Sequence, residues 1–116
     1  TRSVSAFLLN ALPIFEHILF VGLNDKDTKQ QEIDTVTEYR IAMRAVIACG
    51  YEGASITEST GFYTHDNGAT VIEKSLRIDI LNADRRRTGA LIEDLKRALN
   101  QESILFQQTE TSADFV

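Results

Sequence analysis

The sequence predicts a single α+β domain, residues 1–116, built in the order strand, helix, strand, strand, helix, strand. Two segments with apolar residues at helical spacing separate segments that are wholly apolar or alternate in polarity. The dipeptide Asn67-Gly68 stands between the two middle strands, and Asn-Gly is the strongest short signal for a β-hairpin. With 116 residues the chain can bury roughly two thirds of its unfolded surface and needs no disulfide staples.

The first strand is expected over residues 17–23, where residues 18–21 are apolar without interruption, as is typical of a central strand buried on both faces. The apolar residues just before it are similar to a signal-peptide core. Asn10 and Pro13 interrupt them and no small-residue cleavage site follows, so we expect mature protein. No apolar run approaches the ~20 residues of a membrane helix.

A first helix is expected after the polar loop 24–31 and before Gly50, with one buried apolar stripe. Its members recur at helical spacing: Ile33, Val36, Tyr39, Ile41, Met43, Val46 and Ile47. Cys49, the only cysteine, falls on the apolar side, which predicts a buried inert thiol, excludes a disulfide framework and fits a reducing cytoplasm.

The central hairpin organises the chain. Its first strand covers residues 53–64, the turn residues 65–68, and the return strand residues 70–81. Side chains alternate on the return strand, so one face is expected to be core and carries Ile72, Leu76, Ile78 and Ile80, with Lys74 reaching water. The other face is either solvated or a subunit interface or ligand floor, and carries Glu73, Ser75, Arg77 and Asp79.

Asn82 or Asp84 can cap a second helix that ends near Gln101. Its expected core face consists of Leu91, Leu95, Ala98 and Leu99. Residues 104–106 open a last strand that becomes polar after residue 106. The resulting β-α-β-β-α-β order is the ferredoxin-like arrangement, an antiparallel sheet with two helices on one face and with the first and third strands central.

Charge and motifs exclude several functions. Twelve basic and 17 acidic residues give a net charge of -5, which argues against a nucleic-acid partner. The one basic run, residues 85–87, is either a solvated cluster or binds an anion or an acidic neighbour. The sequence has no phosphate-binding glycine loop and no nucleophile-elbow motif, and two histidines cannot build a histidine metal site. We therefore expect no metal, and His65 is expected to be an ordinary solvent-facing turn residue.

Three runs of sequence resemble phage enzymes that degrade S-adenosylmethionine (SAM), the SAM hydrolase and SAM lyase family. They are Glu-Ser-Thr-Gly-Phe-Tyr at residues 58–63, Glu-Lys-Ser-Leu-Arg at 73–77 and Gln-Thr-Glu-Thr at 108–111. The likeness covers about the last two thirds of the chain. It implies a trimeric, PII-like form of the fold, with SAM as substrate held between neighbouring subunits and with no metal or cofactor.

By position, the resemblance assigns catalytic roles to Tyr63, Glu73 and Glu110, although some members have histidine near the place of Glu110. It implies substrate contacts by Ser59, Thr60, Gly61, Phe62 and Ser75. An aromatic face and carboxylates suit the sulfonium of SAM, and an acidic protein attracts that cation. Without the resemblance, Tyr63 packing on the sheet and Glu73 pairing with Lys74 or Arg77 would be the simpler interpretation.

Two reactions of SAM release 5′-methylthioadenosine. A hydrolase would use Glu73 or Glu110 as general base on a water and would give homoserine. A lyase lets the substrate's own carboxylate attack Cγ and gives homoserine lactone, with the glutamates as positioners. We favour the lyase, because its nucleophile is already ionised and tethered. The resemblance implies the biological role of a phage protein that blocks host methylation and SAM-dependent restriction in the host cytoplasm.

Two non-enzymatic alternatives remain open. A PII-like trimer would bind a nucleotide between subunits and signal through the loop of the central hairpin. That loop, residues 64–69, is short here, which disfavours a sensor. A plain ferredoxin-like interaction domain is the other alternative.

Overall fold

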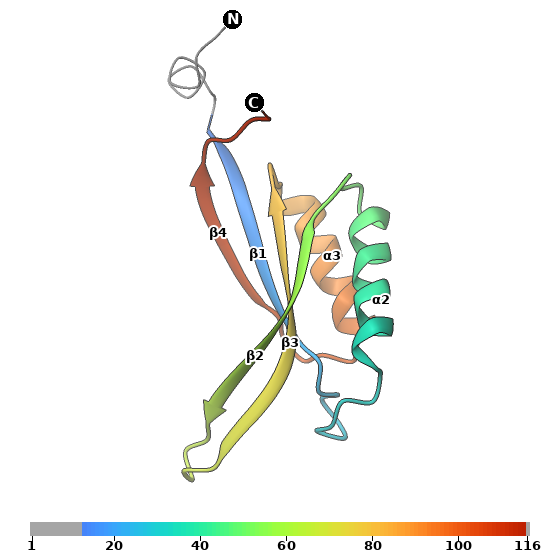
Figure 1. Ribbon diagram of the computed structural model, residues 1–116, viewed down its shortest axis with the longest axis vertical. Coiled ribbons are helices and arrows are strands. Elements are labelled where there is room, and N and C mark those ends of the chain that lie inside the picture. Colours follow the sequence, from blue (N-terminus) through green and yellow to red (C-terminus); the bar gives the residue numbers. More distant parts are fainter. Residues whose placement is uncertain (1–12, 116) are drawn as a thin grey trace, which may run out of the picture.

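The computed structural model describes residues 13–115 and confirms the predicted order of elements. The order is β1 (Ile14–Gly22), α2 (Thr35–Ala48), β2 (Ser55–Thr64), β3 (Thr70–Leu81), α3 (Arg85–Ala98) and β4 (Leu105–Thr111). The antiparallel sheet has the strand order β2-β3-β1-β4, so the first and third strands are central, as predicted. Both helices cover one face of the sheet (Figure 1). Of the signal-peptide-like apolar residues before the predicted first strand, those at positions 7–12 lie outside the described residues, while Ile14 and Phe15 belong to β1.

The core lies between the helices and one face of the central strands. On β1 the buried residues are His17, Leu19 and Val21, while Ile18 and Phe20 on the other face are only half-buried. The strand was expected to be buried on both faces, and in this single chain it is buried on one. The open face of the sheet is therefore free to meet a ligand or another chain.

The first helix buries only part of the predicted stripe. Val46 is buried as predicted, and Ile33 and Ile41 are half-buried against the core. Val36, Tyr39, Met43 and Ile47 are exposed, and Glu38 and Ala42 are buried in their place. Both sets satisfy helical spacing, so periodicity alone cannot choose between them. Ala42 is fully buried, and a small side chain there lets the helix backbone approach the sheet closely. Asp34 caps the helix, its side chain accepting a hydrogen bond from the Thr37 backbone N–H at 2.9 Å.

The second helix follows the prediction more closely. Asp84 is its N-cap and accepts from the Arg87 backbone N–H at 2.8 Å. Leu91, Leu95 and Leu99 are buried as expected, but Ala98 is exposed. The buried place one turn before Leu91 belongs instead to the polar Thr88, a residue that an apolar pattern does not select.

Thr88 belongs to a buried polar network that joins β1 to both helix ends. Its Oγ1 lies 2.7 Å from His17 Nδ1 and 2.7 Å from the Tyr51 hydroxyl. His17 Nε2 lies 2.9 Å from Gln108 Oε1, and the Asp84 backbone N–H donates to the Tyr51 hydroxyl at 2.9 Å. Every ring nitrogen and hydroxyl in the network therefore has a partner, which is what allows polar groups to stay in the core.

The β2–β3 hairpin runs beyond the end of the helical layer (Figure 1). Ile72 on β3 is 72% exposed although it shares a face with the buried Leu76, Ile78 and Ile80, so its predicted place in the core is wrong. Lys74 is exposed, as expected, and pairs with Glu58 at 3.6 Å. The turn closes through a hydrogen bond from His65 N–H to the Ala69 carbonyl at 2.8 Å, and Gly68 takes the positive φ of 87°.

Candidate functional site

A groove of about 730 Å³ lies where the projecting hairpin leaves the rest of the sheet. Its walls come from the end of β1, the loop that follows it, the outer half of the hairpin, and the connection from α3 to β4. The lining residues are Phe20, Gly22, Asn24, Asp25, Lys26, Lys29, Gly61, Phe62, Tyr63, His65, Val71, Glu73, Ser75, Gln101, Glu102, Ser103 and Leu105. The groove is large enough for a small-molecule ligand.

Glu73 points across the open face of the sheet toward the end of β1. Its Oε2 accepts a hydrogen bond from the Asn24 backbone N–H at 2.9 Å. Its strand partner on β2 is Gly61, which has no side chain. The carboxylate is therefore held at the β1 side while the β2 side of the groove stays open. Among the described residues it pairs with neither Lys74 nor Arg77, because Lys74 binds Glu58 and Arg77 binds Asp79 at 3.0 Å.

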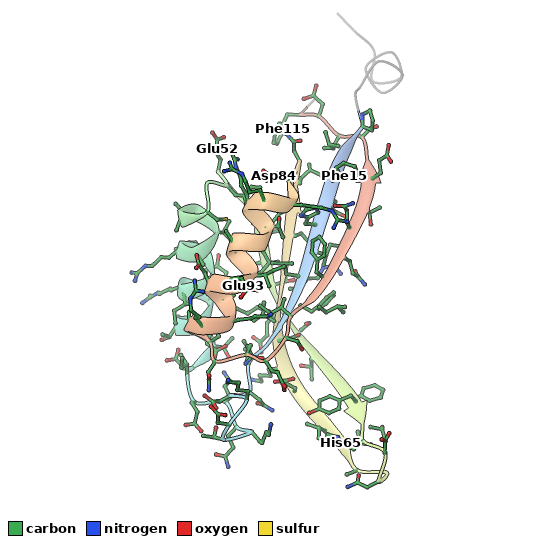
Figure 2. All side chains as sticks on the ribbon, turned by 180° about the vertical axis from the view of Figure 1, so that it is seen from behind. Phe15, Glu52, His65, Asp84, Glu93 and Phe115 are labelled. Atoms are coloured by element: carbon green, nitrogen blue, oxygen red, sulfur yellow. The ribbon has the colours of Figure 1, made fainter. Side chains whose placement is uncertain are left out.

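Tyr63 lies at the other wall of the groove, two residues from Gly61 on the same strand and the same face. It is 49% exposed, and its ring meets the His65 ring edge to face at a centroid distance of 4.9 Å. Figure 2 shows His65 at the tip of the hairpin, well away from the helices. One edge of Tyr63 is thus supported by the turn, and about half of the side chain remains available to a ligand. His65 is exposed in the turn, as expected, and it also lines the groove.

The five predicted substrate-contact residues divide into three groups. Gly61 and Phe62 line the groove beside Tyr63. Ser75 also lines it, but its hydroxyl is hydrogen-bonded to that of Ser59, which is not among the lining residues. Thr60, which pairs with Lys74, is not among the lining residues either.

Glu110 lies apart from the groove within one chain. It is exposed on β4 opposite Phe15, whereas the groove reaches β4 only at Leu105. Its neighbour in the alternation, Gln108, bonds His17 beneath the helices, so Glu110 belongs to the helix-side face and Glu73 to the open face. A single chain brings Tyr63 and Glu73 to one groove and leaves Glu110 outside it.

A second carboxyl group lies close to the groove beneath the sheet. Glu38 is 2% exposed, and its Oε2 has no hydrogen-bond partner among the described residues. Burial, and then the charges of Asp34 and Glu73, raise its pKa to about 7. It lines a smaller cavity of about 220 Å³ with Leu23 and Asp25. The Glu38 carboxyl group therefore titrates near neutral pH, and the charge of Glu73 contributes to this raised pKa.

The groove carries both signs of charge at its rim. Lys26 and Lys29 come from the loop after β1, and Asp25 and Glu102 lie among them. Within residues 13–115 no three His, Cys, Asp or Glu side chains gather as a metal site. This arrangement of charges is suited to a ligand with both cationic and anionic groups.

Cys49 is half-buried, its thiol donates to the Val46 carbonyl, and burial raises its pKa.

The basic run at the start of α3 is largely occupied by contacts within the chain. Arg87 pairs with Asp84 at 3.4 Å and donates to the Gly50 carbonyl at 3.2 Å. The Arg85 guanidinium lies 5.9 Å from the centre of the Phe106 ring. These contacts explain the run without an anion ligand.

Several groove residues were not predicted from the sequence, namely Phe20, Gly22, Asn24, Lys26, Lys29 and Gln101. Most come from loops, where no periodic pattern marks them. Gly22 did carry a signal, because an isolated glycine in an apolar strand often marks a close approach of another group.

No model of a known protein family matches the chain, and no curated protein sequence matches it. Solved structures do. A phage SAM lyase in complex with S-methyl-5′-thioadenosine is similar at 26% identity and a TM-score of 0.57, over 88% of this chain and 92% of that one. A phage SAM lyase in the apo state is similar at 19% identity and a TM-score of 0.60, over 90% and 93%. CutA from Synechococcus elongatus is similar at 16% identity and a TM-score of 0.57, over 86% and 78%.

These comparisons confirm the predicted α+β fold and the resemblance to the phage SAM-degrading enzymes, which are among the structural neighbours of this chain. They do not bear on the individual roles of Tyr63, Glu73 or Glu110. No helix within the described residues is long and apolar enough to cross a membrane.

Proposed function

We propose that this chain is a SAM lyase, which converts SAM to 5′-methylthioadenosine and homoserine lactone in the groove beside the hairpin. The observation that carries the proposal is the structural likeness, over 88% of the chain, to a phage SAM lyase that holds S-methyl-5′-thioadenosine. Tyr63 and Glu73, the two residues that match the family motifs, line one groove here.

The sulfonium and the hydrogen-bonding groups of SAM have suitable neighbours in this groove. The half-exposed ring of Tyr63 offers an aromatic face to the sulfonium, an attraction of about 0.5–2 kcal/mol. Glu73 accepts hydrogen bonds, so it suits ribose hydroxyls or the α-amino group. A carboxylate pressed against the sulfonium would stabilise the reactant more than the transition state, because charge is lost as the reaction proceeds. Glu73 is therefore assigned as a positioner.

The lyase reaction asks little chemistry of the protein. The substrate carboxylate attacks Cγ, the Cγ–S bond breaks, and its electron pair neutralises the sulfonium. The nucleophile is already ionised and tethered, and oriented intramolecular attack reaches effective molarities of order 10⁵ to 10⁸ M. The protein mainly has to hold a folded substrate conformer and exclude water, and we assign no metal or cofactor to the site.

A homotrimer would complete the site. Residues 61–70 are all exposed in one chain, so the groove cannot exclude water by itself. Glu110 also lies outside the groove of its own chain, so it would act on the substrate of a neighbouring subunit. Light scattering tests this arrangement: we expect three times the chain mass of 13.0 kDa, and a monomer at micromolar concentration would contradict it.

The direct test of function is to incubate the purified protein with SAM and measure methylthioadenosine. Glu73→Gln should lower the rate by well over tenfold without unfolding the protein, because it removes a positioning charge and no core volume. Glu58→Gln is the matched control, since Glu58 lies on the same hairpin but on the opposite face, paired with Lys74. Equal rates for Glu73→Gln and wild type would refute the role of Glu73.

The alternative reaction is hydrolysis, in which Glu73 activates a water that would have to reach Cγ. The open groove of a single chain admits water, which is the observation that favours this alternative. Running the reaction in ¹⁸O-water and stopping it early separates the two, because a lyase leaves unlabelled lactone and a hydrolase gives labelled homoserine at once. A protein that binds nucleotides but yields no methylthioadenosine would instead support the PII-like sensor.

The proposed biological role is depletion of SAM in an infected cell, which would block host methylation and SAM-dependent restriction. Expression in a bacterial host should lower the SAM pool and relieve such restriction. Glu73→Gln should do neither, and an unchanged SAM pool with active wild-type protein would contradict this role.

A further inference from the structure

The Glu73 carboxylate lies where a side chain on β1 would otherwise be. A Cβ atom added to Gly22 would stand 2.7 Å from Glu73 Oε2, 2.8 Å from Oε1 and 2.9 Å from Cδ. Carbon atoms are not found this close to such groups, so any residue but glycine at position 22 forces the carboxylate away. The backbone of Gly22 is not in the positive-φ region, so the glycine is required by this contact and not by the chain conformation.

The Asn24 backbone amide holds the Glu73 carboxylate in the space beside Gly22. That N–H donates to Glu73 Oε2 at 2.9 Å, a charge-assisted hydrogen bond. The same peptide region is held from behind, because Gln101 Nε2 donates to the Asn24 carbonyl at 2.7 Å. Lys26 N–H also donates to the Asn100 carbonyl at 3.0 Å, which ties the loop to the end of α3. The loop that carries this amide is thus fixed by contacts with the segment that follows α3.

We propose that Gly22 and the Asn24 backbone amide form a seat for the Glu73 carboxylate, and that Gly22 is a positioning residue for the reaction in the groove. The seat itself stands on the contacts above, while its part in the reaction rests on the proposed function. Seating Oε2 against the protein leaves Oε1 as the less engaged oxygen, and it orients this oxygen before the substrate arrives. A carboxylate without the seat would have to be ordered by the substrate, at the expense of binding and rate.

The variant Gly22→Ala tests the seat with the charge of Glu73 intact. The three atoms nearest to the added methyl all belong to the end of the flexible Glu73 side chain, so the carboxylate can swing away and the fold can stay. The matched control is Gly53→Ala, because a Cβ there meets nothing within 4 Å and Gly53 lies outside the groove. Both variants replace glycine with alanine close to a strand end, so any general effect of alanine is shared.

The first readout does not depend on catalysis. The Asn24 amide proton should resonate downfield in the wild type at neutral pH, because it donates a charge-assisted hydrogen bond to Glu73. This downfield NMR shift should be lost in Gly22→Ala and in Glu73→Gln, and it should persist in Gly53→Ala. Persistence of the downfield shift in Gly22→Ala would overturn the seat.

The second readout is the rate of methylthioadenosine release from SAM. We expect kcat/KM to fall at least tenfold in Gly22→Ala and to stay within twofold of wild type in Gly53→Ala. In a Glu73→Ala background, Gly22→Ala should cause no further loss, because both changes act through one carboxylate. Loss of the seat with a wild-type rate would overturn the role of Gly22 in the reaction. An inactive wild type would overturn the proposed function, while the amide shift would still decide on the seat.

Discussion

The two halves of strand β3 show how one strand can serve two purposes. In the half beneath the helices, Leu76, Ile78 and Ile80 are at most 1% exposed. In the half that projects with the hairpin, Ile72 is 72% exposed on the same face of the same strand. Residues 61–70, at the end of the hairpin, are all exposed. Alternation thus tells which face of a strand is apolar, but the length of the helices decides how much of that face is covered.

This difference separates stability from function along the sheet. The covered half holds the apolar core and the satisfied network of His17, Thr88 and Tyr51. The projecting half holds Tyr63, half-exposed, and little that a single chain could bury. Glu73 stands at the boundary, fastened to the end of β1 through Asn24. A site at such a boundary is anchored by the core on one side and open to ligands on the other.

The largest expected effect is the difference in stability loss when one isoleucine is truncated in each half of β3. Ile78→Ala removes a fully buried side chain and should lower the free energy of unfolding by about 2–5 kcal/mol. Ile72→Ala makes the same chemical change on the same face, and it should cost less than about 0.5 kcal/mol in the single chain. Chemical denaturation under monomeric conditions measures both values.

Equal losses for the two variants would mean that the projecting half is covered as well as the other. A cost for Ile72→Ala that appears only at high protein concentration would place Ile72 in a contact between chains. Either result would mean that the difference between the two halves of β3 exists only in the free chain and disappears when chains assemble.

The same contrast explains how much of the fold was predictable. The order of elements, the bounds of β3 and the Asp84 cap follow from local patterns, and the structure confirms them. The buried stripe of α2 follows only in part. Val46 was predicted, but Val36 and Ile47 offer an apolar stripe as regular as that of Ala42 and Val46. Which stripe faces the sheet depends on packing across the chain, and this information is absent from a helical period.

Glu38 should give the next largest effect, and one that depends on pH. Burial, with the charges of Asp34 and Glu73, raises its pKa from 4.5 to about 7. The folded protein therefore binds this proton more tightly than the unfolded chain does. Its contribution to stability is fully present below pH 4.5 and is lost as the pH rises through about 7.

Glu38→Gln should remove this pH dependence, because glutamine stays neutral. The unfolding free energy of the variant minus that of wild type should therefore be larger at pH 8 than at pH 5, by on the order of 1–3 kcal/mol. Thermal or urea unfolding at both pH values measures the gain. Glu52→Gln is the control, an exposed glutamate (Figure 2) that should give no such difference. A gain that is the same at pH 5 and pH 8 would contradict a buried carboxyl that titrates near neutrality.

The parts of the candidate site that consist of side chains were predictable from the sequence, and the part that consists of a backbone amide was not. Sequence motifs pointed to Tyr63 and Glu73, and the structure places both in one groove. The Asn24 amide has no side-chain signature, since every residue except proline carries the same N–H. Glu110 matched by position, yet strand register sets it on the other face and at the other end of the sheet. Register is a property of pairing between distant segments, which short motifs do not specify.

The smallest effect is expected at Tyr63, where the ring and the hydroxyl can be tested apart. If the aromatic face attracts the sulfonium, Tyr63→Phe should keep the affinity for SAM within about threefold, whereas Tyr63→Leu should weaken it by about 0.5–2 kcal/mol, or roughly 2- to 30-fold. Both changes should leave the unfolding free energy within about 0.5 kcal/mol of wild type, because the side chain is 49% exposed in the projecting half.

Calorimetric titration with SAM in a catalytically impaired Glu73→Gln background measures the affinities. Methylthioadenosine, which lacks the sulfonium charge, is the control ligand and should lose less affinity than SAM in Tyr63→Leu. An equal loss for both ligands would show that Tyr63 recognises the adenosine part and not the cation, and a loss of stability in Tyr63→Leu would show that the projecting hairpin is held by more contacts than one chain supplies.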